Sequence, residues 1–297
     1  MKYLQTVGLA SICLLLALGR SASAASSADI LGQSPDSHWR TADPQYTYVM
    51  QLTDKRMVLI ELAPAFAPRH AAQIAALVKS GWYDGLAIVR VNDNYVTQWG
   101  DAEGTKPLPD GLSRTLPAEF EMPRLPADLP FNAVPGRDAY APEAGFAQGW
   151  PVGRQSARGP AWLAHCYGMV GAGRDSAPDS GGAGELYAVI GHSPRHLDRN
   201  ITVVGRVLLG MEYLAALPRG DDAMGFYATP AQRVPIVSAR LLSQLPDAGR
   251  PVVQVLRTDS SSYARWLEAR RNRTDSWFVR PAGAIDLCNA MPPVRLR

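Results

Sequence analysis

The alternation of apolar and polar residues along the chain predicts several β-strands. Two segments, "YTYVMQL" from Tyr46 and "RMVLIEL" from Arg56, alternate with period two on either side of a short polar turn. This arrangement predicts a β-hairpin. Further strand patterns occur in "AIVRV", "YVTQWG", "HCYGMVGA", "ELYAVIG", "ITVVGRVLLG" and "VPIVSARLL". About seven or eight strands with only two helices favour a mainly β domain, either a closed barrel or a sandwich.

Helical spacing occurs at two places between these strands. Pro68 suits the first position of a helix, and Gly81 suits its end. The residues between them include one apolar stripe at helical spacing, made of Ala71, Ile74, Leu77 and Val78. The segment "MEYLAAL" predicts a second, short helix that ends before Pro218.

Residues 102–160 differ from the rest of the chain because they hold ten of its 24 prolines. Prolines at this density exclude a long helix or a central strand. We expect a loop-rich insertion with one short strand near Ala118 to Phe120. Loops of this length inside a compact domain are usually functional or mobile.

Residues 246–297 form a basic C-terminal extension that looks separate from the main domain. They contain the strand pattern "VVQVL" and a helical segment, "SSSYARWLEARRNR". Residues 250–297 carry nine arginines against four acidic residues. A basic helical tail can meet nucleic acid, but after export an acidic surface or a packed cap fits it better.

The first 24 residues have the pattern of a secretory signal peptide. Lys2 precedes an apolar run from Val7 to Leu18, and small residues, "SASA", end at Ala24. We expect cleavage after Ala24 and a periplasmic or secreted protein; an uncleaved membrane anchor would need about 20 apolar residues. Lys2 and Arg20 leave with the signal, so 28 basic and 27 acidic residues remain. This balance gives no argument for binding nucleic acid or a membrane.

Two cysteines, Cys166 and Cys288, remain after cleavage. In an oxidising compartment such a pair can form a disulfide, which would tie the C-terminal extension to the middle of the chain. Two buried free thiols fit the sequence nearly as well, because the sequence does not supply the distance between them.

Two other kinds of motif point to cofactors only weakly. The glycine-rich segments "GAGRDS" and "GGAGEL" lie between strands with no helix to follow them, so loop glycines are favoured over a phosphate site. His192, His196 and Asp198 could bind a metal. Because Pro194 interrupts any helix that would align them, polar residues of a surface loop are the favoured interpretation.

The hairpin from Ala87 to Asp101 contains the most informative charge, Arg90 within an apolar strand. If the turn consists of residues 92–94, position 90 lies opposite 96 and position 88 opposite 98. Arg90, Val96 and Gln98 would then share one face of the hairpin. By pattern alone, Arg90 is either a functional cation or a structural one paired with an acid such as Asp101.

From about residue 45 to 245, the order and spacing of several motifs resemble the cyclophilins, which are peptidyl-prolyl cis-trans isomerases. The matching segments are "VLIELAPAFAPRHAAQIAALVKSGWYDGLAIVRV", "YVTQWGD", "AEF", "GMV" and "LDRNITVVGRVLLGME". The resemblance implies a closed eight-stranded antiparallel barrel capped by two helices, with the active groove on its outer face. It also implies that the enzyme needs no cofactor and no metal.

The resemblance assigns roles to individual residues. Arg90 matches the catalytic arginine of the family, and Gln98 matches its partner glutamine. The substrate-binding positions implied are Tyr95, Val96, Glu185, Tyr187, His196 and Leu197. The chain departs from the family at three of its positions: Glu185 replaces a glutamine, His196 replaces an aromatic residue, and Asn200 or Ile201 replaces a histidine.

We therefore expect an enzyme that accelerates rotation about X–Pro bonds in exported, unfolded or partly folded proteins. Its partners would be proline-containing polypeptides, and we expect it to act as a monomer without nucleic acid or a membrane. The alternative is a catalytically weak module that binds proline peptides as a chaperone. The departures make the groove more polar and more acidic than is typical of the family.

Overall fold

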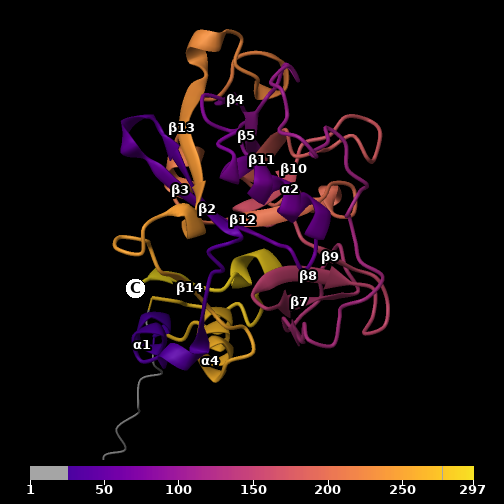
Figure 1. The fold of residues 1–297 in the computed structure, drawn as a ribbon. Coiled ribbons are helices and arrows are strands. Elements are labelled where there is room, and N and C mark those ends of the chain that lie inside the picture. Colours follow the sequence, from indigo (N-terminus) through magenta and orange to yellow (C-terminus); the bar gives the residue numbers. More distant parts are fainter. Residues whose placement is uncertain (1–25, 276) are drawn as a thin grey trace, which may run out of the picture.

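A computed structural model describes residues 26–275 and 277–297, so the predicted signal at residues 1–24 lies outside the described part. Eight antiparallel strands close into a barrel with the order β10-β11-β5-β4-β13-β2-β3-β12 (Figure 1). This confirms the eight-stranded barrel expected from the sequence. The strands are β2 (Thr47–Leu52), β3 (Met57–Leu62), β4 (Ala87–Val91), β5 (Val96–Gly100), β10 (Met169–Ala172), β11 (Glu185–Val189), β12 (Val203–Leu209) and β13 (Val234–Leu241).

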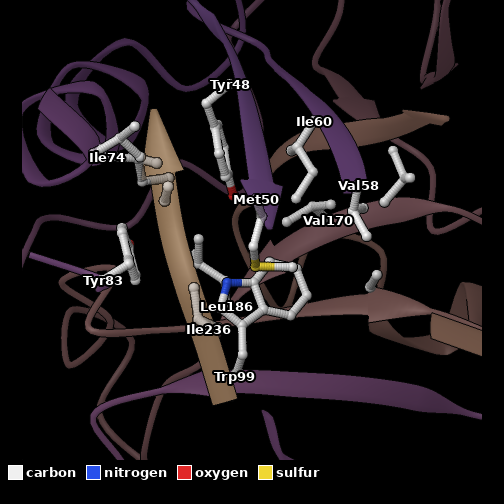
Figure 2. Close-up of a cluster of buried hydrophobic side chains, with 14 of the residues drawn as sticks. Tyr48, Met50, Val58, Ile60, Ile74, Tyr83, Trp99, Val170, Leu186 and Ile236 are labelled. Carbon is white, nitrogen blue, oxygen red and sulfur yellow. The ribbon is translucent and has the colours of Figure 1, made fainter. Parts of the chain in front are cut away.

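The barrel interior is filled by the apolar side chains of the alternating patterns. On β2, every second residue from Tyr48 to Leu52 is buried. Figure 2 shows side chains from β2, β5 and β13, among them Met50, Trp99 and Ile236, gathered in one interior cluster. Because side chains alternate across a strand, the opposite residues of the same strands face outwards and can form a site on the outer wall.

Two helices pack against this interior, as predicted. Helix α2 (Pro68–Lys79) begins at its proline and buries the whole predicted stripe. It ends just before Gly81, which adopts a positive φ of 73° that favours glycine. Helix α3 (Met211–Ala215) contributes Leu214 to the same core. Among the described residues, no helix is long and apolar enough to cross a membrane.

Residues 102–130 of the insertion form loops, as expected, but its later part forms strands of a sheet, where the sequence predicted none. It supplies β6 (Phe131–Ala133), β7 (Glu143–Ala147) and β8 (Trp150–Arg154), which continue into β9 (Ala161–Leu163) as a four-stranded antiparallel sheet. The strands have three to five residues, so they fit between the prolines. Pro151 lies inside β8, where its carbonyl still accepts a hydrogen bond from Ala164. Proline has no backbone N–H to donate, so it fits into a strand at a position where the sheet does not need that hydrogen bond.

The strand expected near Ala118 to Phe120 is absent from the structure, and the prediction was wrong. Glu119 instead caps α2, because its carboxylate accepts hydrogen bonds from the backbone N–H groups of Arg69 and His70 at 3.1 Å. These are among the first N–H groups of the helix, which have no partner within it. A polar residue in this segment therefore stabilises the helix rather than a strand.

The C-terminal extension packs against the rest of the chain and is not a separate unit. Its strands β14 (Val253–Leu256) and β15 (Val294–Leu296) form a sheet with β1 (Trp39–Thr41), which precedes the barrel. Helix α4 (Ser261–Arg271) packs against α1 (Ser27–Gly32) at the lower end of the molecule (Figure 1). A second hydrophobic core joins the extension to the insertion sheet through Phe146, Trp150, Tyr263 and Trp266.

Two further links hold this second core to the barrel. Cys166 and Cys288 form a disulfide between residues 122 positions apart. The carboxylate of Glu61 on β3 accepts hydrogen bonds from Arg206 on β12 and from Arg40 on β1. Arg206 also donates to the carbonyl of Gly149 next to β8. One buried acid thus connects the barrel, the N-terminal strand and the insertion.

Candidate active site

Arg90 and Gln98 lie directly opposite each other on β4 and β5. The predicted pairing of position 90 with 96 was wrong because the loop consists of residues 93–95 rather than 92–94. The backbone N–H of Asn92 donates to the carbonyl of Val96, which closes the hairpin one position later than expected. A β-bulge between Ile88 and Arg90 then shifts the register by one residue, so that Ile88 lies opposite Trp99 rather than opposite position 98 as predicted. The two polar side chains therefore share a face, as predicted, and are closer than predicted.

The guanidinium of Arg90 is fixed by neutral groups and has no acidic partner within ion-pair distance among the described residues. Its Nη1 donates to Oε1 of Gln98 at 3.1 Å, and its Nε donates to the carbonyl of Met224 at 2.7 Å. The cation lies near the rings of Tyr95 and Phe226, 5.8 and 5.3 Å from their centroids. The side chain is not a salt-bridged structural arginine.

The alternative partner, Asp101, is already occupied. Its carboxylate lies 3.2 Å from Nη1 of Arg114 and accepts hydrogen bonds from the backbone N–H groups of Thr105 and Lys106. Arg90 is only 8% exposed, and this burial lowers its pKa from the ordinary value, although nearby Tyr95 and Glu185 oppose the shift. An arginine remains charged in a protein. Its buried Nη2 makes no hydrogen bond with the part of the chain described.

Gln98 connects Arg90 to Glu185 on the neighbouring strand β11. Its Oε1 accepts from Arg90, and its Nε2 donates to Oε1 of Glu185 at 3.0 Å. An arginine has only donors and an ionised carboxylate has only acceptors, so this arrangement fixes which way the amide points. Burial raises the pKa of Glu185, and the acidic neighbours Asp175 and Asp101 add to the rise.

Arg90, Gln98 and Glu185 form a polar row across β4, β5 and β11. Beside this polar row, an apolar cluster covers the outer wall of the barrel. Val96, Tyr187 and Val189 are buried, and Tyr95 and Ile201 pack against them. The polar row and part of this cluster line one cleft of about 480 Å³. The cleft brings together most of the residues predicted for the site, namely Arg90, Tyr95, Val96, Gln98, Glu185, Tyr187 and Leu197.

His196 is the predicted site residue that the structure places differently. It does not line the cleft but stacks on Tyr95, with the two rings nearly parallel and their centroids 6.4 Å apart. Tyr95 is the residue that faces the cleft. His196 is exposed and directly precedes Leu197, which lines the cleft.

Among the cleft residues that the sequence did not indicate, Met224 and Phe226 contact Arg90 directly. They belong to the segment after α3, and Met224 lies in a single 3-10 turn (Ala223–Gly225). Met224 holds Arg90 through its carbonyl, and Phe226 packs its ring on the guanidinium. The only signal in the sequence is the apolar "MGFY" within a polar loop, which does not indicate a partner more than 130 positions away.

A buried polar chain lies behind the apolar cluster. The hydroxyl of Tyr187 is 3.0 Å from Nε2 of His165, whose Nδ1 is 3.0 Å from the carboxylate of Asp198. Asp198 accepts from Arg195, which also pairs with both carboxylate oxygens of Asp138 in the insertion. Asp198 is therefore not available to a metal. Among the described residues, no group of His, Cys, Asp and Glu side chains could hold a metal ion.

The comparisons with known proteins match the barrel to one family. Residues 47–241 match the family model "Cyclophilin type peptidyl-prolyl cis-trans isomerase/CLD". A "Probable peptidyl-prolyl cis-trans isomerase" of Brucella suis is 29% identical over 183 residues, which cover 61% of this chain and 76% of that protein. A protein of the same name from Brucella abortus is 28% identical over the same length.

A solved structure resembles the chain beyond the barrel. The crystal structure of cyclophilin AquaCyp293 from Hirschia baltica superposes with a TM-score of 0.70 at 25% identity, covering 92% of this chain and 97% of that chain. This coverage exceeds residues 47–241, so the likeness includes parts of the chain outside the barrel segment. The family match, the eight-stranded barrel and the motif order agree, and the chain belongs to the cyclophilin-type peptidyl-prolyl cis-trans isomerases.

Proposed function

We propose that this chain catalyses the cis–trans isomerisation of X–Pro bonds in polypeptides, with Arg90 as the catalytic cation. The observation that carries the proposal is the state of Arg90: it is buried, free of acidic partners in the described chain, and fixed by Gln98 and Met224 beside an apolar cleft. A cation held in this way is available to a substrate.

The chemistry of the reaction requires such a donor. Resonance gives the peptide bond a rotation barrier of about 18–20 kcal/mol, although the two forms of an X–Pro bond differ by only about 0.5–1 kcal/mol. When the bond twists, resonance is lost and the proline nitrogen regains its lone pair. A cationic donor next to this nitrogen interacts more strongly with the twisted state than with the planar one, which is the condition for catalysis.

The apolar side of the cleft would bind the proline ring. Val96, Tyr187 and Leu197 offer apolar surface beside Arg90, and burial of the ring there would remove water from the amide. In a site of low polarity, the interaction between the guanidinium and the lone pair is stronger than in water. Gln98 would keep the guanidinium in position while the bond rotates.

We also propose that the protein acts after export, on unfolded or partly folded chains. The secretory pattern of residues 1–24 supports export. The disulfide between Cys166 and Cys288 also supports it, because disulfides persist mainly in oxidising compartments such as the periplasm. We expect a monomer, and a cleft that opens to solvent suits extended polypeptides as substrates.

The test is the Arg90→Ala variant of the chain without residues 1–24, in an assay of a proline peptide. We expect kcat/KM to fall about 100-fold or more, which is typical for loss of one positioned donor. Arg56→Ala is the matched control, since Arg56 pairs with Asp54 in the hairpin away from the cleft. Unchanged turnover in Arg90→Ala would refute the assignment. If wild type bound proline peptides without turnover, the chain would be the binding module instead.

A further inference from the structure

One carboxylate oxygen of Glu185 has no partner in the described part of the chain. Its Oε1 accepts the hydrogen bond from Gln98, whereas Oε2 has no hydrogen-bond or ion-pair partner among residues 26–275 and 277–297. The side chain lines the cleft and is partly exposed to it. The free oxygen therefore faces the space that a substrate would occupy.

The neighbours of Glu185 favour a cation at this position. Asp175, Asp101 and Glu103 all lie close enough to raise its pKa further after burial has raised it. Asp101 and Glu103 have their own partners, Arg114 and Arg233, and Asp175 has no basic partner in the described chain. A positive group beside Glu185 would thus relieve repulsion among several acids.

The arginines that line the cleft, Arg90, Arg114 and Arg174, do not supply that positive group, because none lies within ion-pair distance of Glu185. Arg90 is directed to Gln98 and Met224. Arg174 donates to the backbone carbonyls of Asn200, Asp175 and Ser176 and is not within ion-pair distance of Glu185. A cation that pairs with Glu185 would therefore come from outside the described chain.

Glycines line the wall of the cleft next to Glu185. The cleft wall on this side is lined by Gly173, Gly182 and Gly184. A Cβ atom at residue 173 would lie 3.2 Å from Cβ of Glu185, so a larger residue there would crowd the Glu185 side chain. The wall is therefore bare backbone, with the carboxylate of Glu185 at its edge.

We propose that Glu185 forms a subsite for a lysine or arginine side chain of the substrate, within about two residues of the proline. This proposal rests on the proposed function, because it takes Arg90 to be the position of the prolyl bond. Only the amide of Gln98 separates Arg90 from Glu185, with contacts of 3.1 and 3.0 Å on its two sides. An extended chain advances about 3.3–3.6 Å per residue, so a basic side chain one or two residues from the proline reaches Glu185.

The substitution Glu185→Gln distinguishes two roles of Glu185, the recognition of a basic substrate side chain and the positioning of Gln98. A glutamine at 185 has nearly the same size and can still accept the hydrogen bond from Gln98, but it removes the charge. If Glu185 only orients Gln98, this variant keeps all substrate preferences. If Glu185 binds a cation, the variant loses one preference selectively.

The experiment measures kcat/KM without a coupling protease for proline peptides that carry Lys, Gln or Glu at either the first or the second residue on each side of the proline. For wild type, we expect the lysine peptide to be favoured over the glutamine peptide about tenfold at one of these positions, which corresponds to one charge-assisted contact. In Glu185→Gln, this ratio should fall to near one, because the variant removes the charge that would bind the lysine side chain. Glu212→Gln, an exposed acid on α3, is the matched control.

Equilibrium binding of the same peptides to Arg90→Ala, followed by fluorescence anisotropy, distinguishes the two proposals. A lysine preference in binding without turnover would support the subsite even if the proposed catalytic function failed. A wild-type protein with no lysine preference at any position, or a preference that persists in Glu185→Gln, would overturn the subsite.

Discussion

The hydroxyl of Tyr187 and Nε2 of His165 lie 3.0 Å apart and connect the apolar cluster of the cleft to a buried chain of ion pairs. Asp198 holds the other ring nitrogen of His165, and Arg195 links Asp198 to Asp138 in the insertion. A carboxylate accepts hydrogen bonds, so Nδ1 of His165 donates to Asp198. In the neutral ring, Nε2 is then the acceptor for Tyr187.

Tyr187→Phe removes one hydroxyl from this chain and keeps the ring that faces the cleft. Because His165 is buried, its Nε2 would lose its partner, and we expect the free energy of unfolding to fall by about 1–3 kcal/mol. Turnover of a proline peptide should change only a few-fold. Urea denaturation checks the first result. Tyr213→Phe is the control, since the hydroxyl of Tyr213 has no hydrogen-bond partner among the described residues; equal effects in both variants would contradict the role of the chain.

Glu61→Gln should be strongly destabilising. It would leave the buried guanidinium of Arg206, which is 2% exposed, without its carboxylate, and breaking a buried pair costs about 3–5 kcal/mol. Glu143→Gln makes the same change in the partly exposed pair with Arg154 and should cost about 1 kcal/mol or less. Chemical denaturation of both variants measures the difference. A cost for Glu61→Gln as small as that of the control would contradict the connecting role of Glu61.

The pH dependence of this effect has a defined sign. Burial of Glu61 raises its pKa, but the charges of Arg206 and Arg40 outweigh burial, so the pKa in the folded state is lowered from 4.5. A lowered folded pKa stabilises the protein above the pKa of the unfolded state and loses this contribution as the pH falls through the folded pKa. The stability difference between wild type and Glu61→Gln should therefore shrink in acid, which denaturation at several pH values below about 4.5 checks.

Glu185→Gln should have the opposite effect at neutral pH and stabilise the protein. Burial and then Asp175, Asp101 and Glu103 raise the pKa of Glu185 above 4.5. A raised folded pKa contributes stability below the unfolded pKa, and this contribution is lost as the pH rises through the folded pKa. Thermal unfolding should show a gain for the variant at pH 7 that disappears below about pH 4. A loss of stability at pH 7, or the same gain in Glu212→Gln, would contradict this expectation.

The disulfide should stabilise the second core. Replacing Cys166 and Cys288 together by alanine should lower the free energy of unfolding by about 2–5 kcal/mol under oxidising conditions, because the bridge closes a long loop in the unfolded chain. With a reductant present, most of the difference from wild type should vanish, and the remainder measures the packing of the lost sulfur atoms. If reductant leaves the difference unchanged, the bridge does not contribute as proposed.

The parts of the fold that follow from local pattern could be predicted from the sequence. The apolar stripe of α2 and the alternation in β2 depend on helical and strand periodicity, and both are seen in the structure. The sheet of the insertion could not be predicted, because its strands are short and one contains Pro151. Burial there comes from long-range packing against the C-terminal extension, which no local pattern reports.

The residues of the candidate site could likewise be predicted only where they lie within one local segment of the chain. Arg90 and Gln98 could be placed on one face because they belong to a single hairpin, although the bulge and the loop shifted their register. Phe226 and His165 come from distant segments and reach the site only through the tertiary fold. The departure at Glu185 was visible in the sequence, but its free oxygen and its acidic neighbours were not.

The pairing of β1 with β14 has a consequence for the order of folding during synthesis. The barrel is complete once residue 241 has emerged, since β13 then closes against β2 and β4. The second core forms later, because Phe146 and Trp150 pack against Tyr263 and Trp266, which are synthesised after the barrel. Long-range contacts of this kind form slowly and leave apolar surface exposed in the meantime. The nascent chain should therefore pass through a stage in which the catalytic barrel is folded while the insertion sheet remains uncovered.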